Sequence, residues 1–217
     1  MNLIDFVNKY WNYYMQLEND FFSFEAYCSI DNDNDDSFST RYLQLFLSIC
    51  GEIDTICKTF CKKLDNSLNT NNCRITNYIK ILNANYTTFA EEKIKLNNYK
   101  YLSFKPWENL KSNSSPDWWK EYNLVKHHRD EITDGKENYK LANQKNTIQA
   151  LCALYILIEY WISDIFIHDP TYSNIIMPKL KSKKFTLENW DDFYPFFAGD
   201  TRFDKEKFLK YINGEQT

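Results

Sequence analysis

Residues that break helices and turn strands are scarce in this chain. Its 217 residues include only 4 glycines and 5 prolines. An all-β sandwich or barrel needs many tight turns, and glycine and proline are the residues that most often form them. Their scarcity therefore excludes a many-stranded β architecture and favours long helices.

Excess positive charge and paired metal-binding cysteines are also lacking. The formal net charge is −4, so the chain has no global positive field to drive non-specific binding to nucleic acid. The 6 cysteines include no C-x-x-C pair. We therefore expect buried free thiols in a reducing cytosol, with no disulfide framework, no metal site and no cofactor.

Membrane-spanning sequence is lacking as well. The one long apolar run, 148–167, is interrupted by Glu159 and Asp164, which would be costly in lipid. It predicts a buried core helix, and we expect no membrane association. Asp5 and Lys9 lie inside the N-terminal apolar pattern, which argues against a signal peptide. The expected location is cytoplasmic.

Bulky apolar residues are plentiful, with 43% hydrophobic and 18% aromatic residues. Apolar residues spaced alternately three and four apart predict long helices over 3–28 and 43–64, antiparallel if the loop between them is short. A shorter helix is predicted over 74–82. The segment 142–167 is apolar all round, which places a helix at the centre of a bundle or at a subunit interface.

Two parts of the chain depart from this helical pattern. Residues 93–96 and 99–104 read as strands joined by a tight Asn97-Asn98 turn, within an insertion at about 84–116. The fold class is therefore mainly all-α, an antiparallel helical bundle over 1–167 with a small β-hairpin insertion. Residues 168–217 form a C-terminal extension packed on the bundle. The extension contains a basic run at 179–184, a short strand at 185–187, a last helix at 204–212 and the anchoring aromatic residues Trp190, Phe193, Tyr194, Phe196 and Phe197.

The acidic segment 31–36 alternates Asp and Asn in the manner of a calcium loop. Asp36 stands where such a loop needs glycine, and Tyr42 stands where it needs glutamate. Both departures damage a calcium site, so the segment predicts a solvated turn. The residues after it provide good N-caps for the second helix, namely Ser37, Ser39 and Thr40.

Trp118 to Arg129 is the most informative stretch of the chain, on a helix that Asp117 is placed to cap. An imidazole moves protons near neutral pH, and a neighbouring cation holds a phosphate. Together these groups suit metal-independent RNA cleavage, in which a 2′-hydroxyl attacks the adjacent phosphate. The candidate site residues are Tyr122, Asn123, Lys126, His127, His128 and Arg129.

The segment from Tyr122 to His127 resembles the motif of the HEPN superfamily, an Arg, often followed by a polar residue, with a His four to six residues after the Arg. Asn123 and His127 match the polar residue and the His. Tyr122 replaces the Arg, leaving Lys126 or Arg129 to supply its charge. With the long helices included, the resemblance covers about two thirds of the chain. It implies an all-helical domain of a prokaryotic toxin or phage-defence system, dimerising so that two motif helices line a cleft.

Three functions follow from these residues. The first is a HEPN-like domain that binds RNA or a partner protein, and the second is a metal-independent endoribonuclease. In the third, the motif only stabilises the bundle, with Lys126 and His127 in buried pairs with Glu52 or Asp54. A homodimer is expected because the apolar helix has more surface than one small bundle covers. A zinc site of His127, His128 and His168 is disfavoured, since adjacent histidines diverge around a helix.

Overall fold

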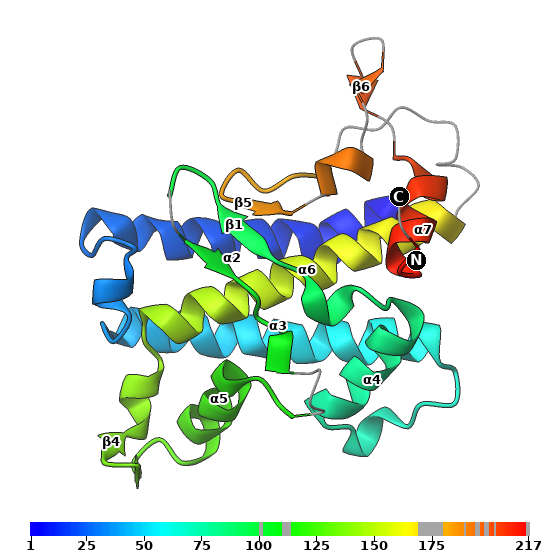
Figure 1. The fold of residues 1–217 in the computed structure, drawn as a ribbon. Coiled ribbons are helices and arrows are strands. Elements are labelled where there is room, and N and C mark those ends of the chain that lie inside the picture. Colours follow the sequence, from blue (N-terminus) through cyan, green and yellow to red (C-terminus); the bar gives the residue numbers. More distant parts are fainter. Residues whose placement is uncertain are drawn as a thin grey trace.

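The structure is a computed structural model, and it describes residues 1–99, 102–109, 114–168, 180–188, 190–193, 196–197, 200–201 and 203–215. Long helices dominate these residues, and the sheets contain only two or three short strands. The expected fold class, mainly α with a small β insertion, is confirmed (Figure 1).

The first helical segment is continuous from residue 3 to residue 26. It comprises α1 (Leu3–Phe6), a π-helical turn (Val7–Trp11), α2 (Asn12–Ser23) and a 3₁₀ turn (Phe24–Ala26). Asn2 caps its start by accepting a hydrogen bond from the Asp5 N–H at 2.8 Å. The long first helix is confirmed. Its predicted apolar seam faces the core, with Leu3, Tyr14, Leu17 and Phe21 buried and Val7, Tyr10 and Phe24 partly buried against them.

Helix α3 (Thr40–Leu64) runs antiparallel to α2 (Figure 1). Ser39 is its N-cap, because the Ser39 hydroxyl accepts a hydrogen bond from the Tyr42 N–H at 3.1 Å. One of the three predicted caps is thus confirmed. The core face of α3 is apolar and fully buried, with Ile49, Ile53, Ile56 and Phe60.

Helix α6 (Gln144–His168) packs against α2, α3 and α5 in the centre of the bundle. Among the described residues it is the one helix long and apolar enough to cross a membrane, and 94% of its most apolar window is buried in the protein. It is therefore a core helix, as predicted. A single chain already covers this helix, so the reason given for a homodimer no longer holds.

Asp164, one of the two acidic residues that interrupt the apolar run of α6, has specific partners. Asp164 is 1% exposed. It forms an ion pair with Lys63 of α3 and accepts a hydrogen bond from the Tyr86 hydroxyl at 3.2 Å. This pairing explains how a residue that interrupts the apolar run remains in the core.

The predicted hairpin provides two strands of a three-stranded sheet in the order β2-β1-β5, with β1 in the middle. Strand β1 (Ile94–Leu96) pairs antiparallel with β2 (Ser103–Phe104) and with β5 (Phe185–Leu187). Asn98 has the expected positive φ of 70°. The predicted tight turn is present, because the Tyr99 N–H donates to the Leu96 carbonyl at 3.3 Å across Asn97 and Asn98. The second strand begins later than the predicted residue 99, because the Leu96 N–H pairs with the Leu102 carbonyl at 3.1 Å and β2 begins at Ser103.

Shorter elements surround this core. Helix α4 (Ile75–Asn85) lies between 3₁₀ turns at Thr70–Asn72 and Phe89–Glu91. Helix α5 (Asp117–His127) is followed by a hairpin of β3 (Ile132–Thr133) and β4 (Lys136–Glu137) and by a 3₁₀ turn (Asn138–Leu141). The sequence analysis missed this hairpin. Its signal was Asp134-Gly135, since both residues have positive φ, of 52° and 79°, as a tight hairpin turn requires.

The described part of the C-terminal extension contains β5, a 3₁₀ turn called η9 (Trp190–Phe193), the pair β6 (Phe196–Phe197) and β7 (Asp200–Thr201), and α7 (Lys205–Ile212). Asp204 caps α7 by accepting from the Lys207 N–H at 3.0 Å, which confirms the last helix. Trp190 and Phe193 are each 2% exposed and so anchor the extension. Tyr194 lies outside the described residues, as do the side chains of Phe196 and Phe197.

Candidate functional site

Helix α5 carries the predicted site residues, and its apolar face is buried in the protein core. Trp118, Trp119 and Tyr122 are buried, and the Trp118 indole N–H donates to the Pro106 carbonyl at 2.8 Å. Asp117 is not the N-cap as predicted, because Pro116 occupies that position. Asp117 instead lies in the first turn, where its carboxylate pairs with Lys120 at 2.8 Å and still favours the positive end of the helix.

The helix ends within the motif. His127 is the last helical residue and His128 is the C-cap, so His128 and Arg129 continue into the following turn. Asn123 and His127 remain one helical turn apart, as predicted. Lys126, His127, His128 and Arg129 are all exposed. The buried pairs of a purely structural motif are therefore not formed by Lys126 or His127.

Several polar side chains of this stretch contact residues three or four positions away in the sequence. The Asn123 side-chain amide donates to the Trp119 carbonyl at 2.8 Å. His128 Nδ1 lies 2.9 Å from a carboxylate oxygen of Glu131, and Arg129 Nε donates to the Val125 carbonyl at 3.3 Å. These contacts shape the end of α5 and leave His127 as the exposed imidazole on the Asn123 face.

Tyr122 is a core residue at the position where the family pattern has an arginine. It is 5% exposed, and its ring lies 5.0 Å from Trp119 and 6.1 Å from Phe46 of α3, measured between ring centroids. Burial raises the pKa of the Tyr122 hydroxyl, although Lys126 beside it acts in the opposite direction. Tyr122 therefore contributes packing and carries no charge.

A cleft of about 310 Å³ opens beside Tyr122, between α3, the start of α4 and α5. We call it the Arg74–Lys126 cleft, because these two cations line it from separate elements. Arg74 is the N-cap residue of α4, where its N–H donates to the Asn77 side chain at 2.9 Å. The residues that line the cleft are Asp54, Cys73, Arg74, Ile75, Ser115, Trp119, Tyr122, Asn123 and Lys126.

The charge in the Arg74–Lys126 cleft favours an anion. Arg74 and Lys126 are both exposed cations. The Lys126 ammonium lies 5.4 Å from the centroid of the Tyr122 ring. The acid among the lining residues, Asp54, is already paired with Lys58 at 2.6 Å. A guanidinium and an ammonium that line the same cleft provide the donors that a phosphate group prefers.

The predicted catalytic imidazoles, those of His127 and His128, do not line the Arg74–Lys126 cleft. None of the described residues that line the cleft is a histidine, so neither His127 nor His128 is placed in its wall. Arg129 is also outside the lining. The structure thus groups Tyr122, Asn123 and Lys126 of the six candidates and separates the other three. Sequence reasoning missed Arg74, because no spacing or periodicity links the start of α4 to α5.

The basic run does not join this site. Its described part, Leu180 to Lys184, leads into β5, which Figure 1 shows on the other side of α6 and α3 from α5. The Lys184 ammonium lies 4.7 Å from the centroid of the Phe22 ring. Lys179 lies outside the described residues. The basic run and the Arg74–Lys126 cleft therefore belong to different surfaces.

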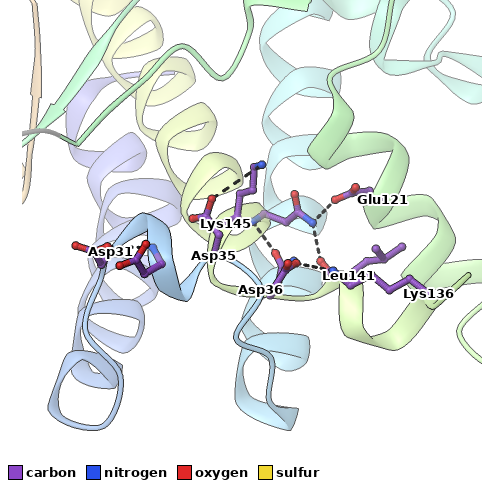
Figure 2. Close-up of polar contacts among 10 residues, drawn as sticks. Asp31, Asp35, Asp36, Glu121, Lys136, Leu141 and Lys145 are labelled. Atoms are coloured by element: carbon purple, nitrogen blue, oxygen red, sulfur yellow. Dashed lines mark hydrogen bonds and ion pairs between the residues drawn. The ribbon is translucent and has the colours of Figure 1, made fainter. Parts of the chain in front are cut away.

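The acidic segment 31–36 contacts residues at the start of the central helix, α6. Asp36 accepts a hydrogen bond from Lys136 at 2.5 Å (Figure 2). It also accepts one from the Asn143 side chain at 3.4 Å, just before α6 begins. Asp35 lies 4.0 Å from Lys145, and Asp31 caps a 3₁₀ turn (Asn32–Asn34). The segment is thus a docked loop as well as a solvated one. Among the described residues, no group of three or more His, Cys, Asp and Glu is arranged to hold a metal ion.

Comparison with family models, with curated proteins and with solved structures gives no match for this chain. Its function is therefore argued from the geometry of its own residues.

Proposed function

We propose that the chain is a HEPN-like helical domain of a prokaryotic defence or toxin-type system, located in the cytoplasm, that binds single-stranded RNA without cleaving it. The observation that carries this proposal is that Arg74 and Lys126, from different elements, line one cleft together with Asn123. The resemblance of Asn123 and His127 to the HEPN motif supports RNA as the source of the phosphate.

Each residue has a distinct role in phosphate binding. The guanidinium of Arg74 is suited to two parallel hydrogen bonds with phosphate oxygens. The ammonium of Lys126, which lines the same cleft from α5, adds a mobile point charge. Asn123 has one amide hydrogen committed to the Trp119 carbonyl, which orients its remaining donor and its oxygen. His127, one helical turn further along, extends the same face for a neighbouring nucleotide.

The absence of cleavage follows from where the imidazoles lie. General acid–base catalysis requires a side chain within hydrogen-bonding reach of the proton that it moves. No described residue in the lining of the Arg74–Lys126 cleft is a histidine, and Tyr122 replaces a permanent cation with a buried phenol. The alternative, a metal-independent endoribonuclease, is favoured by one observation, the exposed His127 on the Asn123 face.

The test is RNA binding measured by fluorescence anisotropy with labelled single-stranded RNA across a range of salt concentrations. Arg74→Ala and Lys126→Ala should each weaken binding about tenfold and reduce the salt slope by about one. Lys80→Ala is the matched control, since Lys80 is an exposed cation of α4 that does not line the cleft. Unchanged binding in both cleft variants, or equal weakening in the control, would overturn the proposal.

Cleavage is tested with the same RNA in the presence of EDTA. We expect intact RNA with the wild type and with His127→Ala. Cleavage by the wild type that disappears in a folded His127→Ala variant would establish the endoribonuclease instead. If RNA does not bind at all, a partner protein becomes the better candidate for the site.

A further inference from the structure

Glu92 is a buried carboxylate that joins three separate elements. It lies between the 3₁₀ turn Phe89–Glu91 and β1, and it is 2% exposed. One of its oxygens accepts hydrogen bonds from the Tyr160 hydroxyl at 2.5 Å, from the Trp190 indole N–H at 3.1 Å and from the Tyr211 hydroxyl at 3.1 Å. These donors belong to α6, η9 and α7, so one side chain connects the bundle to the C-terminal extension.

All three donors are uncharged. The titratable groups that face Glu92 are Tyr160 of α6 and Tyr211 of α7, and η9 contributes Trp190, which does not titrate. The hydroxyls of Thr88 and Tyr160 lie 3.0 Å apart, which adds another neutral group. Burial raises the pKa of Glu92 to about 7, and the three hydrogen bonds only partly oppose that effect. None of the described charged side chains contributes to this shift.

The contacts around Glu92 hold the extension in place. Thr87 fixes the end of α7, because its N–H and its hydroxyl both donate to the Ile212 carbonyl, at 2.8 Å and 2.7 Å. The Trp190 ring packs 5.1 Å from the Tyr160 ring and 5.2 Å from the Phe208 ring. Glu92 is therefore the acidic centre of an aromatic cluster between bundle and extension.

We propose that Glu92 is a pH-sensitive latch that holds η9 and α7 on the bundle when its carboxyl is neutral and loosens them when it ionises. The physical reason is that a buried carboxylate without a cation is costly, whereas a local opening allows water to solvate it. Opening would expose the aromatic faces of Tyr160 and Phe208. This inference is independent of RNA binding.

The direction of the pH effect follows from proton linkage. The pKa of Glu92 in the folded protein, about 7, lies above the ordinary value of 4.5. The latch is thus strongest below pH 4.5 and weakens as the pH rises to about 7, beyond which it changes little. Between mildly acidic and mildly alkaline pH, the opening constant of α7 should rise on the order of tenfold.

The experiment is hydrogen exchange of the α7 amides at both pH values, corrected for the intrinsic pH dependence of exchange. We expect the rise in the wild type and in Glu91→Gln, which removes an exposed neighbouring carboxyl, but not in Glu92→Gln. A rise of the same size in Glu92→Gln, or none in the wild type, would refute the latch. If Glu92→Gln does not fold, the test is a pH titration of the assigned ¹³C resonance of the Glu92 carboxyl in the wild type. A midpoint near 7 supports the latch, and one near 4.5 overturns it.

Discussion

Glu18 of α2 accepts a hydrogen bond from the Ser182 hydroxyl at 2.5 Å, although the two residues are 164 positions apart. The same carboxylate oxygen accepts from the Tyr14 hydroxyl. Ser182 in turn accepts from the N–H groups of Lys184 and Phe185, at 2.9 Å and 2.8 Å. This network attaches the segment before β5 to the first helix.

Ser182→Ala should lower the free energy of unfolding by about 1–3 kcal/mol, because it leaves buried hydrogen-bonding groups without their partner. Urea denaturation followed by circular dichroism measures the change. The matched control is Ser67→Ala, whose hydroxyl bonds to Asp65 on the surface and whose loss should change stability by less than about 0.5 kcal/mol. Equal effects of the two substitutions would contradict the structural role of Ser182.

Lys63→Met should destabilise the protein more than Lys58→Met, although both lysines belong to α3. Lys63 pairs with Asp164, which is 1% exposed, whereas Lys58 pairs with the partly exposed Asp54. Loss of a partner from a buried carboxylate costs about 1–3 kcal/mol, while exposed pairs contribute about 0–1 kcal/mol. Thermal and urea unfolding of both variants provide the comparison. A larger loss with Lys58→Met would be inconsistent with the buried pair.

Gln144→Ala should loosen the loop 29–36, which packs against the start of α6. The Gln144 side chain is 1% exposed and donates to the Ser29 carbonyl at 3.1 Å and to the Tyr42 hydroxyl at 3.2 Å. It also accepts from the Asp31 N–H at 3.2 Å. We expect a loss of about 1–3 kcal/mol and faster proteolysis within 29–36. Gln16→Ala, at an exposed glutamine bonded to Asp20, should leave both measurements nearly unchanged.

Calcium should not stabilise the protein, and EDTA should not destabilise it. Asp36 is held by Lys136, and the Asp31 side chain accepts from the Asp33 N–H at 3.0 Å, so these oxygens already have partners. The expected result is the same Tm in differential scanning fluorimetry with calcium, with EDTA and with neither. A calcium-dependent rise in Tm that Asp36→Ala abolishes would show that the segment binds the ion after all.

The long helices were predictable because their signal is local. Apolar spacing predicted 43–64 and 142–167, and the structure has α3 at Thr40–Leu64 and α6 at Gln144–His168. The cap at Ser39 and the positive φ of Asn98 were also readable, since each depends on the chemistry of one residue and its neighbours.

The candidate site was only partly predictable. Tyr122, Asn123 and Lys126 were identified from a motif on one helix, and the structure brings them together. Arg74 was not, because the loop and helix that carry it to α5 are positioned by packing against α3. Spacing along a chain reports which residues share a face of an element, and it does not report which other element lies opposite.

By itself, the sequence determined a helical core and a short β segment, since helical periodicity and the scarcity of turn residues act within a few residues. The expectation of buried thiols is confirmed for Cys50, Cys57, Cys61 and Cys152, whereas Cys28 and Cys73 are only half-buried. Only the tertiary structure decided that β5 pairs with β1, that α6 is covered within one chain and that Arg74 and Lys126 line the same cleft. It also decided that Glu92 meets donors from three elements. Each of these depends on contacts between distant segments, whose partners are selected by the packing of the whole core.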